Sequence, residues 1–270
     1  MGIFEAIILG ITQGITEFLP VSSTGHLILV RDIFGISSEN NFAFDTILQL
    51  ATLFAVIIYF RHDIWELIKT AYALVRGKIV PDTDKIFLYA LIVGTLPAVV
   101  FGLFLTDVIE NVFRHSLVVA IGLCFGTLLM VYAEKKLSGG SALSVRKGLS
   151  IGWFQALALL PGISRSGATI SGGMLAGLSR EQATRFAFVL SFPVLLGAGL
   201  LSIHSLLGAP SAGGQMTALI VGCIASFLSG LAAIHFLVTY LKTHSFSVFI
   251  WYRLILAGII VLLYGVGILL

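Results

Sequence analysis

Charged residues are scarce in this chain. Of its 270 residues, 11% are Asp, Glu, Lys or Arg and 58% are hydrophobic, whereas soluble domains carry about 25% charged residues. This scarcity excludes an ordinary soluble domain and predicts a protein that crosses a membrane several times. The net charge of +3 is too small to indicate nucleic-acid binding. The two cysteines, Cys124 and Cys223, lie inside apolar runs and predict no disulfide framework.

Long apolar stretches predict where the chain crosses the membrane. A spanning helix needs about 20 mostly apolar residues. Six stretches meet this requirement: 43–60, 86–106, 116–134, 186–206, 217–240 and 248–269. Two others, 3–34 and 149–178, are interrupted by Pro and Gly, which stop a helix. Since each half of these is too short to cross, we expect two re-entrant helical hairpins that enter and leave by the same face.

The interrupted stretches resemble each other. The segment ITQGITEFLPVSSTGH is similar to WFQALALLPGISRSGA, with Gln13 opposite Gln155 and Gly25 opposite Gly167. NFAFDTILQLATLFAV is similar to RFAFVLSFPVLLGAGL, and ALIVGTLPAVVFG to ALIVGCIASFLSG. Three matches in the same order predict two structural repeats.

The repeats define the expected architecture. The halves, about 1–135 and 143–270, each hold one hairpin and three spans. Because three is odd, the second half must be inverted relative to the first, as in folds whose broken helices meet near the membrane midplane. We therefore predict an all-α integral membrane protein in which 1–270 form a single domain with an inverted-topology repeat.

Basic residues predict the orientation. Threading the six spans places twelve Lys and Arg on one side and two, Arg31 and Arg114, on the other, with Arg165 and Arg253 left in the membrane region. Cytoplasmic loops carry the excess of Lys and Arg. Both termini then face outward, the first hairpin enters from outside and the second enters from the cytoplasm.

The two hairpin tips are expected to meet near mid-membrane. They carry these polar side chains: Glu17, Ser22, Ser23, Thr24, His26, Ser164, Arg165, Ser166 and Thr169. A charge there costs about 2.5–3.5 kcal/mol on insertion scales, so we expect Glu17 and Arg165 to face and offset each other. A purely structural ion pair is one interpretation, but the surrounding hydroxyls favour a ligand. Asp45 and Gln49, on one face of the first span, are candidates for supporting contacts.

The second tip has the chemistry of an anion site. An Arg guanidinium is planar, permanently charged and suited to phosphate oxygens. Ser164, Ser166 and the backbone N–H groups of a glycine-rich turn add donors. A helix beginning near Thr169 would point its N-terminal end at the same place. We therefore expect an anion to bind beside Arg165.

The first tip has the chemistry of the reacting half. Ser22 and Ser23 precede His26 by four and three residues. If Pro20 opens the returning helix, this spacing places the serines and the imidazole on one face. A serine hydroxyl within reach of an imidazole is an activated nucleophile, and Glu17 can orient the imidazole, take a proton or hold a metal ion. Helix capping is the alternative role for the hydroxyl residues.

The motifs QGITEFLPVSSTGH and PGISRSGAT together resemble the two signature motifs of the undecaprenyl-diphosphate phosphatase (bacitracin-resistance) family. The resemblance covers the whole chain, including its length and span pattern. It implies a hydrolase of the bacterial cytoplasmic membrane that converts a C55 polyprenyl diphosphate into the monophosphate carrier of cell-wall (peptidoglycan) synthesis. It also implies dependence on a divalent cation, Mg²⁺ or Ca²⁺. The count of basic residues, and not the resemblance, predicts an active site open to the extracytoplasmic side.

The resemblance assigns roles to individual residues. It implies that Glu17, Ser23, His26 and Arg165 are catalytic. It implies that Ser22, Ser164, Ser166 and Thr169 surround the diphosphate, and we expect Gln13 and Thr24 to bind the substrate as well. The family often has two glutamates four residues apart, and the first position is Gln13 in this chain. Because Gln13 has no carboxylate and cannot act as a base, this pair does not form a two-carboxylate metal site, and we expect Glu17 to hold the metal jointly with the diphosphate.

The working hypothesis is that Ser23, activated by His26, attacks the terminal phosphorus while Arg165 clamps the phosphates. Attack by water or by His26 itself stays open. A transporter or lipid flippase of inverted-repeat type is a second class, and an intramembrane serine protease is a third. The expected partners are a polyprenyl diphosphate lipid and the membrane, with no nucleic acid, and a homodimer stays open.

Overall fold

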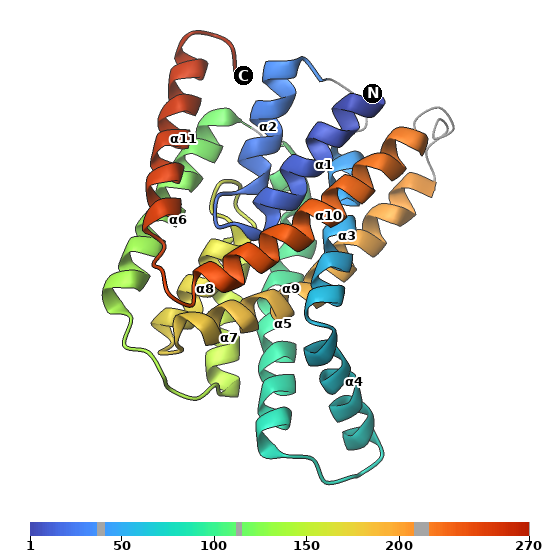
Figure 1. Ribbon diagram of the computed structural model, residues 1–270, viewed down its shortest axis with the longest axis vertical. Helices are drawn as coiled ribbons and strands as arrows, with labels where there is room; N and C mark the ends of the chain where they lie inside the picture. The colour runs from blue at the N-terminus through green and yellow to red at the C-terminus, as the bar shows by residue number, and fades with distance from the viewer. Residues whose placement is uncertain (37–40, 112–114, 208–215, 270) are drawn as a thin grey trace.

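The computed structural model describes residues 1–36, 41–111, 115–207 and 216–269, and all regular secondary structure in these ranges is helical (Figure 1). The helices are α1 (Ile3–Phe18), α2 (Ser23–Phe34), α3 (Asn41–Tyr59), α4 (Arg61–Val75), α5 (Asp82–Asn111), α6 (Ser116–Lys136), α7 (Val145–Leu157), α8 (Arg165–Leu175), α9 (Arg180–Leu207), α10 (Met216–Tyr240) and α11 (Ser247–Gly265). The two termini lie at one end of the molecule, opposite the turn that joins α4 to α5 (Figure 1).

The described helices account for five or six membrane spans. Five are long and apolar enough to cross: Asp82–Phe104, Ser116–Lys136, Arg180–Leu200, Met216–Tyr240 and Ser247–Gly265. A sixth candidate is α3, which bends by 82° into α4. The prediction of an all-α, multi-pass membrane protein is confirmed at this level.

The interruptions at 19–22 and 158–164 each join a short helical pair, α1–α2 and α7–α8. Pro20 has no N–H to donate, and Leu19 before it has the extended conformation that proline imposes, with φ −67° and ψ 143°. In the second interruption Gly162 has φ +91°, and a Cβ there would lie 2.8 Å from the backbone nitrogen of Leu123 on α6. Both helical pairs are therefore broken where the sequence predicts, with proline in one turn and a positive-φ glycine in the other.

Each returning helix begins at a strained serine. Ser22 has φ 73° and Ser164 has φ 74°, and among the described residues they are the two with positive φ that are not glycine. Such a conformation costs of order 1–3 kcal/mol and persists only where the surroundings enforce it, most often at functional sites. The matching strain marks the two tips as equivalent and as candidates for function.

Glycines let the hairpins pack closely against long helices. A Cβ on Gly14 of α1 would meet the carbonyl of Ser226 and lie 2.7 Å from the nitrogen of Gly230, both on α10. A Cβ on Gly152 of α7 would lie 2.8 Å from the Cα of Gly94 on α5. These approaches position the tips in the middle of the molecule, where the turns α1–α2 and α7–α8 meet (Figure 1).

Candidate functional site

Glu17 is the centre of a buried polar cluster at the tips. Its side chain is 3% exposed, and each carboxylate oxygen accepts two hydrogen bonds. Oε2 accepts from Gln13 Nε2 and from Ser23 Oγ, both at 2.9 Å. Oε1 accepts from Arg165 Nη2 at 2.8 Å and from Gln49 Nε2 at 3.2 Å. Four donors from α1, α2, α3 and α8 thus bind one carboxylate. They supply the pairing and the hydrogen bonds that a buried charge needs.

Arg165 faces Glu17, as the cost of isolated charges in a membrane predicts. The ion pair is 2.8 Å long and the arginine side chain is 15% exposed. The other terminal nitrogen, Nη1, is buried and has no hydrogen-bond partner within the described residues. Leaving a buried guanidinium donor unpaired is unfavourable, so Nη1 is a donor available to an anionic ligand beside the pair.

Backbone carbonyls join the two tips. Ser166 Oγ donates to the carbonyl of Leu19 at 3.1 Å and lies 3.2 Å from Ser164 Oγ. Arg253 of α11 donates to the carbonyls of Pro20 at 3.1 Å and Gly162 at 2.9 Å. The tips are therefore one structural unit.

Helices α2 and α8 both begin at this cluster. Ser164 caps α8 by accepting a hydrogen bond from the Gly167 N–H at 3.3 Å. Ser22 makes no side-chain capping bond to α2. Helix N-termini attract anions through their free N–H groups, so two helix ends and Arg165 favour the same kind of ligand.

His26 lies apart from the Ser23 hydroxyl. Its Nδ1 is 2.8 Å from the carbonyl of Ser22, and its Nε2 is 2.6 Å from the hydroxyl of Tyr252. Because a carbonyl only accepts, Nδ1 must carry the proton, and the neutral ring accepts from Tyr252 through Nε2. The expected hydrogen bond between a tip serine and the imidazole is absent from the described residues. Ser23 donates to Glu17 instead, because Glu17 reaches it from α1.

The two threonines lie outside the hydrogen-bonded cluster. Thr24 is exposed in the first turn of α2. Thr169 is 1% exposed, and its hydroxyl bonds within its own helix, to the carbonyl of Arg165 at 2.7 Å and to that of Ser166 at 3.3 Å. A hydroxyl bonded back to its own helix is not directed at a ligand.

Three further residues contribute to the cluster. Gln49 was expected only as a supporting contact, and it binds Glu17 directly. Tyr252 and Arg253 had no assigned role in the sequence. The cost of a charged residue within the apolar span 248–269 was a signal that Arg253 needs buried partners.

The donor set does not fit a metal ion held by the protein alone. Among the described residues, no group of three or more His, Cys, Asp or Glu side chains lies together. Glu17 is the carboxylate of the cluster, and four N–H and O–H donors already occupy its oxygens. Mg²⁺ and Ca²⁺ prefer six or more oxygen ligands, and Gln13 supplies Glu17 with an N–H in place of a second carboxylate.

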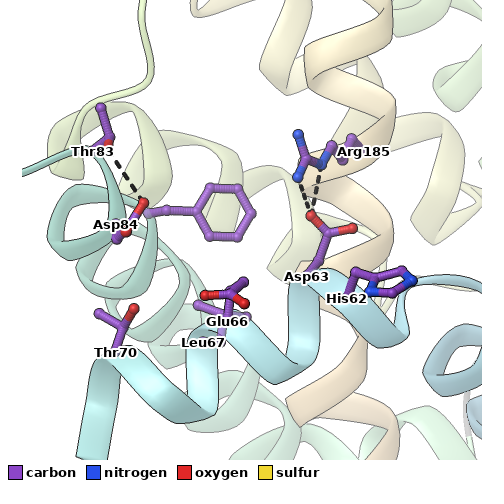
Figure 2. A pocket seen from close by; sticks show the side chains of 9 residues that line it. His62, Asp63, Glu66, Leu67, Thr70, Thr83, Asp84 and Arg185 are labelled. Carbon is purple, nitrogen blue, oxygen red and sulfur yellow. Dashed lines mark hydrogen bonds and ion pairs between the residues drawn. The ribbon is translucent and has the colours of Figure 1, made fainter. Parts of the chain in front are cut away.

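A separate cavity of about 360 Å³ lies between α4, α5 and α9 (Figure 2). Asp63 in its wall accepts hydrogen bonds from Arg185, one of them from Nε at 2.8 Å. It shares no residue with the tip cluster and contains none of the residues predicted to act on a phosphate. The cavity is therefore a separate feature from the cluster of predicted site residues.

Together these features define a polytopic, helical membrane protein with a buried Glu–Ser–Arg cluster where two helical hairpins meet. Residues 6–259 match the family described as Bacitracin resistance protein BacA. An undecaprenyl-diphosphatase of Chlorobium chlorochromatii is 43% identical, covering 99% of this chain and 99% of its own length. Those of Myxococcus xanthus and Micrococcus luteus are 40% and 38% identical over 99% and 98% of this chain, and 91% and 98% of their own. The chain belongs to the bacitracin resistance protein BacA family, and the family prediction from its two motifs is confirmed.

Proposed function

We propose that the chain is an undecaprenyl-diphosphatase, which hydrolyses a C55 polyprenyl diphosphate to the monophosphate and inorganic phosphate. The observation that carries this function is the chain of contacts Ser23–Glu17–Arg165, with an unpaired guanidinium nitrogen at its end. The nucleophile Ser23 and the anion clamp Arg165 both bind the buried carboxylate of Glu17, which is the base. The relatives named undecaprenyl-diphosphatase support a hydrolase, and no comparison favours the transporter or protease alternatives.

The geometry supports a two-step phosphoryl transfer. The diphosphate binds at the N-termini of α2 and α8, with Arg165 Nη1 donating to a phosphate oxygen. Ser23 Oγ attacks the terminal phosphorus, its proton passes to Glu17 Oε2, and the polyprenyl monophosphate leaves with the electron pair of the broken P–O bond. Water then attacks the phosphoserine, and Ser23 Oγ leaves with the electron pair of its P–O bond and takes back the proton from Glu17. Inorganic phosphate is released with both protons of the water, and Ser23 and the Glu17 carboxylate are restored.

Proton transfer to Glu17 also strengthens the clamp. In the free protein the Arg165 charge is offset by Glu17 at 2.8 Å. Once Glu17 is protonated, the guanidinium loses this counter-ion, and its full charge faces the phosphate oxygens. An interaction that strengthens as the reaction proceeds stabilises the transition state more than the bound substrate, so it lowers the reaction barrier.

A divalent cation at this site would be held mainly by the substrate, and it would neutralise part of the diphosphate charge. Since the tip cluster does not fit a protein-only metal site, the diphosphate oxygens are the ligands that match Mg²⁺ or Ca²⁺. The carboxylate that would share such an ion is Glu17, and one of its four present hydrogen-bond donors would have to give way. Gln13 and Gln49 hold Glu17 in place through their amide donors.

The two halves form an inverted repeat whose hairpins are re-entrant. Supporting this, Gly10 of α1 packs against the carbonyl of Gly222, and Gly152 of α7 packs against that of Gly94. Gly10 and Gly152 occupy matching positions of the first repeated segment, and Gly94 and Gly222 match in the ALIVG segments. Each hairpin thus packs on a span of the other half. The side that carries most of the Lys and Arg residues faces the cytoplasm of the bacterial cell. The first hairpin then enters the cytoplasmic membrane from outside, and the site opens to the extracytoplasmic face.

Release of inorganic phosphate by purified protein tests this function. Wild type in detergent should release phosphate from C55 diphosphate, and Arg165→Ala should lower kcat/KM by about 10²–10³-fold, as for other preorganised charge stabilisers. Arg180→Ala, which removes an ion pair with Glu134 outside the tips, is the matched control. Lipid uptake into vesicles without hydrolysis would support the flippase, and unaltered release by Arg165→Ala would exclude the clamp.

A further inference from the structure

Arg253 of α11 has no role in the reaction described above, yet it is completely buried. Its guanidinium has an acceptor for every nitrogen. Nε donates to Thr127 Oγ1 at 2.9 Å, and Nη1 donates to the Pro20 carbonyl at 3.1 Å. Nη2 lies 3.0, 2.9 and 3.0 Å from the carbonyls of Leu123, Gly162 and Ile163. One side chain thus binds both hairpin tips and α6.

The carbonyls that Arg253 binds are equivalent in the two tips. Gly162 follows Pro20 by the same number of residues that separates Gln13 from Gln155 in the repeated segments. The guanidinium therefore contacts the same position of each turn. A contact of this kind sets the position of one tip relative to the other.

The partners of Arg253 are neutral. In the described part of the chain, all its acceptors are carbonyls or a hydroxyl, and its charge has no carboxylate partner. Burying such a charge is costly, and complete hydrogen bonding offsets that cost only in part. An apolar side chain would avoid the cost, so a stability role alone does not explain an arginine here.

The surrounding backbone leaves room for this group. A Cβ at Gly126 of α6 would collide with Nη2 of Arg253 and lie 3.1 Å from the Cα of Ile163. Because position 126 is glycine, the second tip and the guanidinium can both lie against α6.

We propose that Arg253 is a positioning residue that fixes the position of one tip relative to the other, so that Ser23 and Arg165 contact the same phosphate. Pro20 lies three residues before Ser23, and Ile163 lies two residues before Arg165. Pinning these carbonyls to one rigid group fixes the nucleophile relative to the clamp. This inference rests on the proposed diphosphatase activity for its kinetic readout.

Arginine suits this task better than lysine. Its planar fork presents five N–H groups in fixed directions, whereas lysine presents three from one nitrogen. Lysine keeps the charge but cannot reach both turns and Thr127 together. A charge-only role would be preserved in Arg253→Lys, and a positioning role would not.

Kinetics of three variants separate these roles. Arg253→Ala should lower kcat by about 100-fold, the cost of small misplacements in active sites, with little change in KM because the group does not touch the substrate. Arg253→Lys should also lose most of kcat. Millimolar guanidinium chloride should restore part of kcat in Arg253→Ala by refilling the cavity, and Arg180→Lys should behave as wild type. A normal kcat in Arg253→Lys would overturn the proposal, as would a change confined to KM.

Hydrogen–deuterium exchange gives a readout that does not depend on activity. In folded Arg253→Ala, amides of both 19–26 and 161–168 should exchange faster than in wild type, while those of α4 should not change. Unaltered exchange in both turns would overturn the proposal even if activity fell. If wild type released no phosphate, the diphosphatase assignment would fail, and the exchange result would still decide whether Arg253 joins the tips.

Discussion

The hydroxyl of Ser23 donates a hydrogen bond to Oε2 of Glu17 across 2.9 Å, and the guanidinium of Arg165 binds the other oxygen of the same carboxylate. Two residues that are far apart in the chain are thereby attached to one buried group. The relationship makes Glu17 the residue placed to receive the serine proton, a role that spacing along the first motif had suggested for His26.

Removing the Ser23 hydroxyl tests this assignment. Ser23→Ala should lower kcat by about 10³-fold or more, since it deletes the nucleophile. Acid quenching of wild type with labelled diphosphate should trap an acid-stable phosphoserine. Ser245→Ala, at a partly exposed serine outside the tips that lies 2.8 Å from the hydroxyl of Ser247, is the control. Full turnover in Ser23→Ala would exclude a serine nucleophile, and an acid-labile phosphoenzyme would indicate His26.

Tyr252 should matter through His26. Tyr252→Phe removes the hydroxyl that lies 2.6 Å from Nε2 and keeps the parallel ring, whose centroid is 5.6 Å from the imidazole. A neutral hydrogen bond contributes about 0.5–1.5 kcal/mol, so kcat should fall by about 2- to 10-fold.

The same helix supplies a matched control for this change. Tyr264 lies against His115 with ring centroids 5.7 Å apart, away from the tips. Tyr264→Phe should leave kcat unaltered. Equal losses in the two phenylalanine variants would mean that tyrosines of α11 act on stability and not on His26.

Gln13→Glu should change the response to metal. It would place a second carboxylate beside Oε2 of Glu17, where the amide now lies at 2.9 Å. Two such carboxylates repel unless a proton or a cation lies between them. We expect Gln13→Glu to reach half-maximal activity at a lower Mg²⁺ or Ca²⁺ concentration than wild type. After a chelator removes the metal, the variant should be less active than wild type.

The control for Gln13→Glu is Gln182→Glu, an equal charge change at an exposed position. Phosphate release measured across a metal titration compares the two. Identical metal curves in Gln13→Glu and wild type would show that the pair does not share a cation.

Gly14 should be essential for packing. A Cβ there would collide with backbone atoms of α10, and overpacking costs about 1–3 kcal/mol. Gly14→Ala should therefore lower Tm in detergent. Gly258→Ala, where no heavy atom lies within 4 Å of the added Cβ, should hold or raise Tm because alanine favours helix over glycine. An unchanged Tm in Gly14→Ala would contradict the close approach of α1 and α10.

Much of this arrangement follows from local rules. Apolar length predicts the spans, and the clusters of Pro and Gly around Pro20 and Gly162 predict the two breaks. The high cost of a lone charge in an apolar stretch predicts that Glu17 and Arg165 face each other. Both predictions follow from the chemistry of individual residues and from the match between the two repeated segments, so they can be made from the sequence.

The partners of His26 illustrate what local rules miss. Helical spacing correctly places Ser22 near the ring, but through its backbone carbonyl and not its hydroxyl. The orientation of a side chain that has several possible partners depends on which helix packs beside it. Here α11 brings Tyr252 to Nε2, and α1 brings Glu17 to Ser23.

By itself, the sequence determined the membrane class, the helical breaks, the family and the residue types at the tips, because hydropathy, proline geometry and motif chemistry act within a short stretch of chain. Only the tertiary structure decided that Gln49 binds Glu17, that Tyr252 binds His26 and that Arg253 binds both turns. These contacts join helices distant in the chain, and their geometry is set by how closely glycine-lined helices pack.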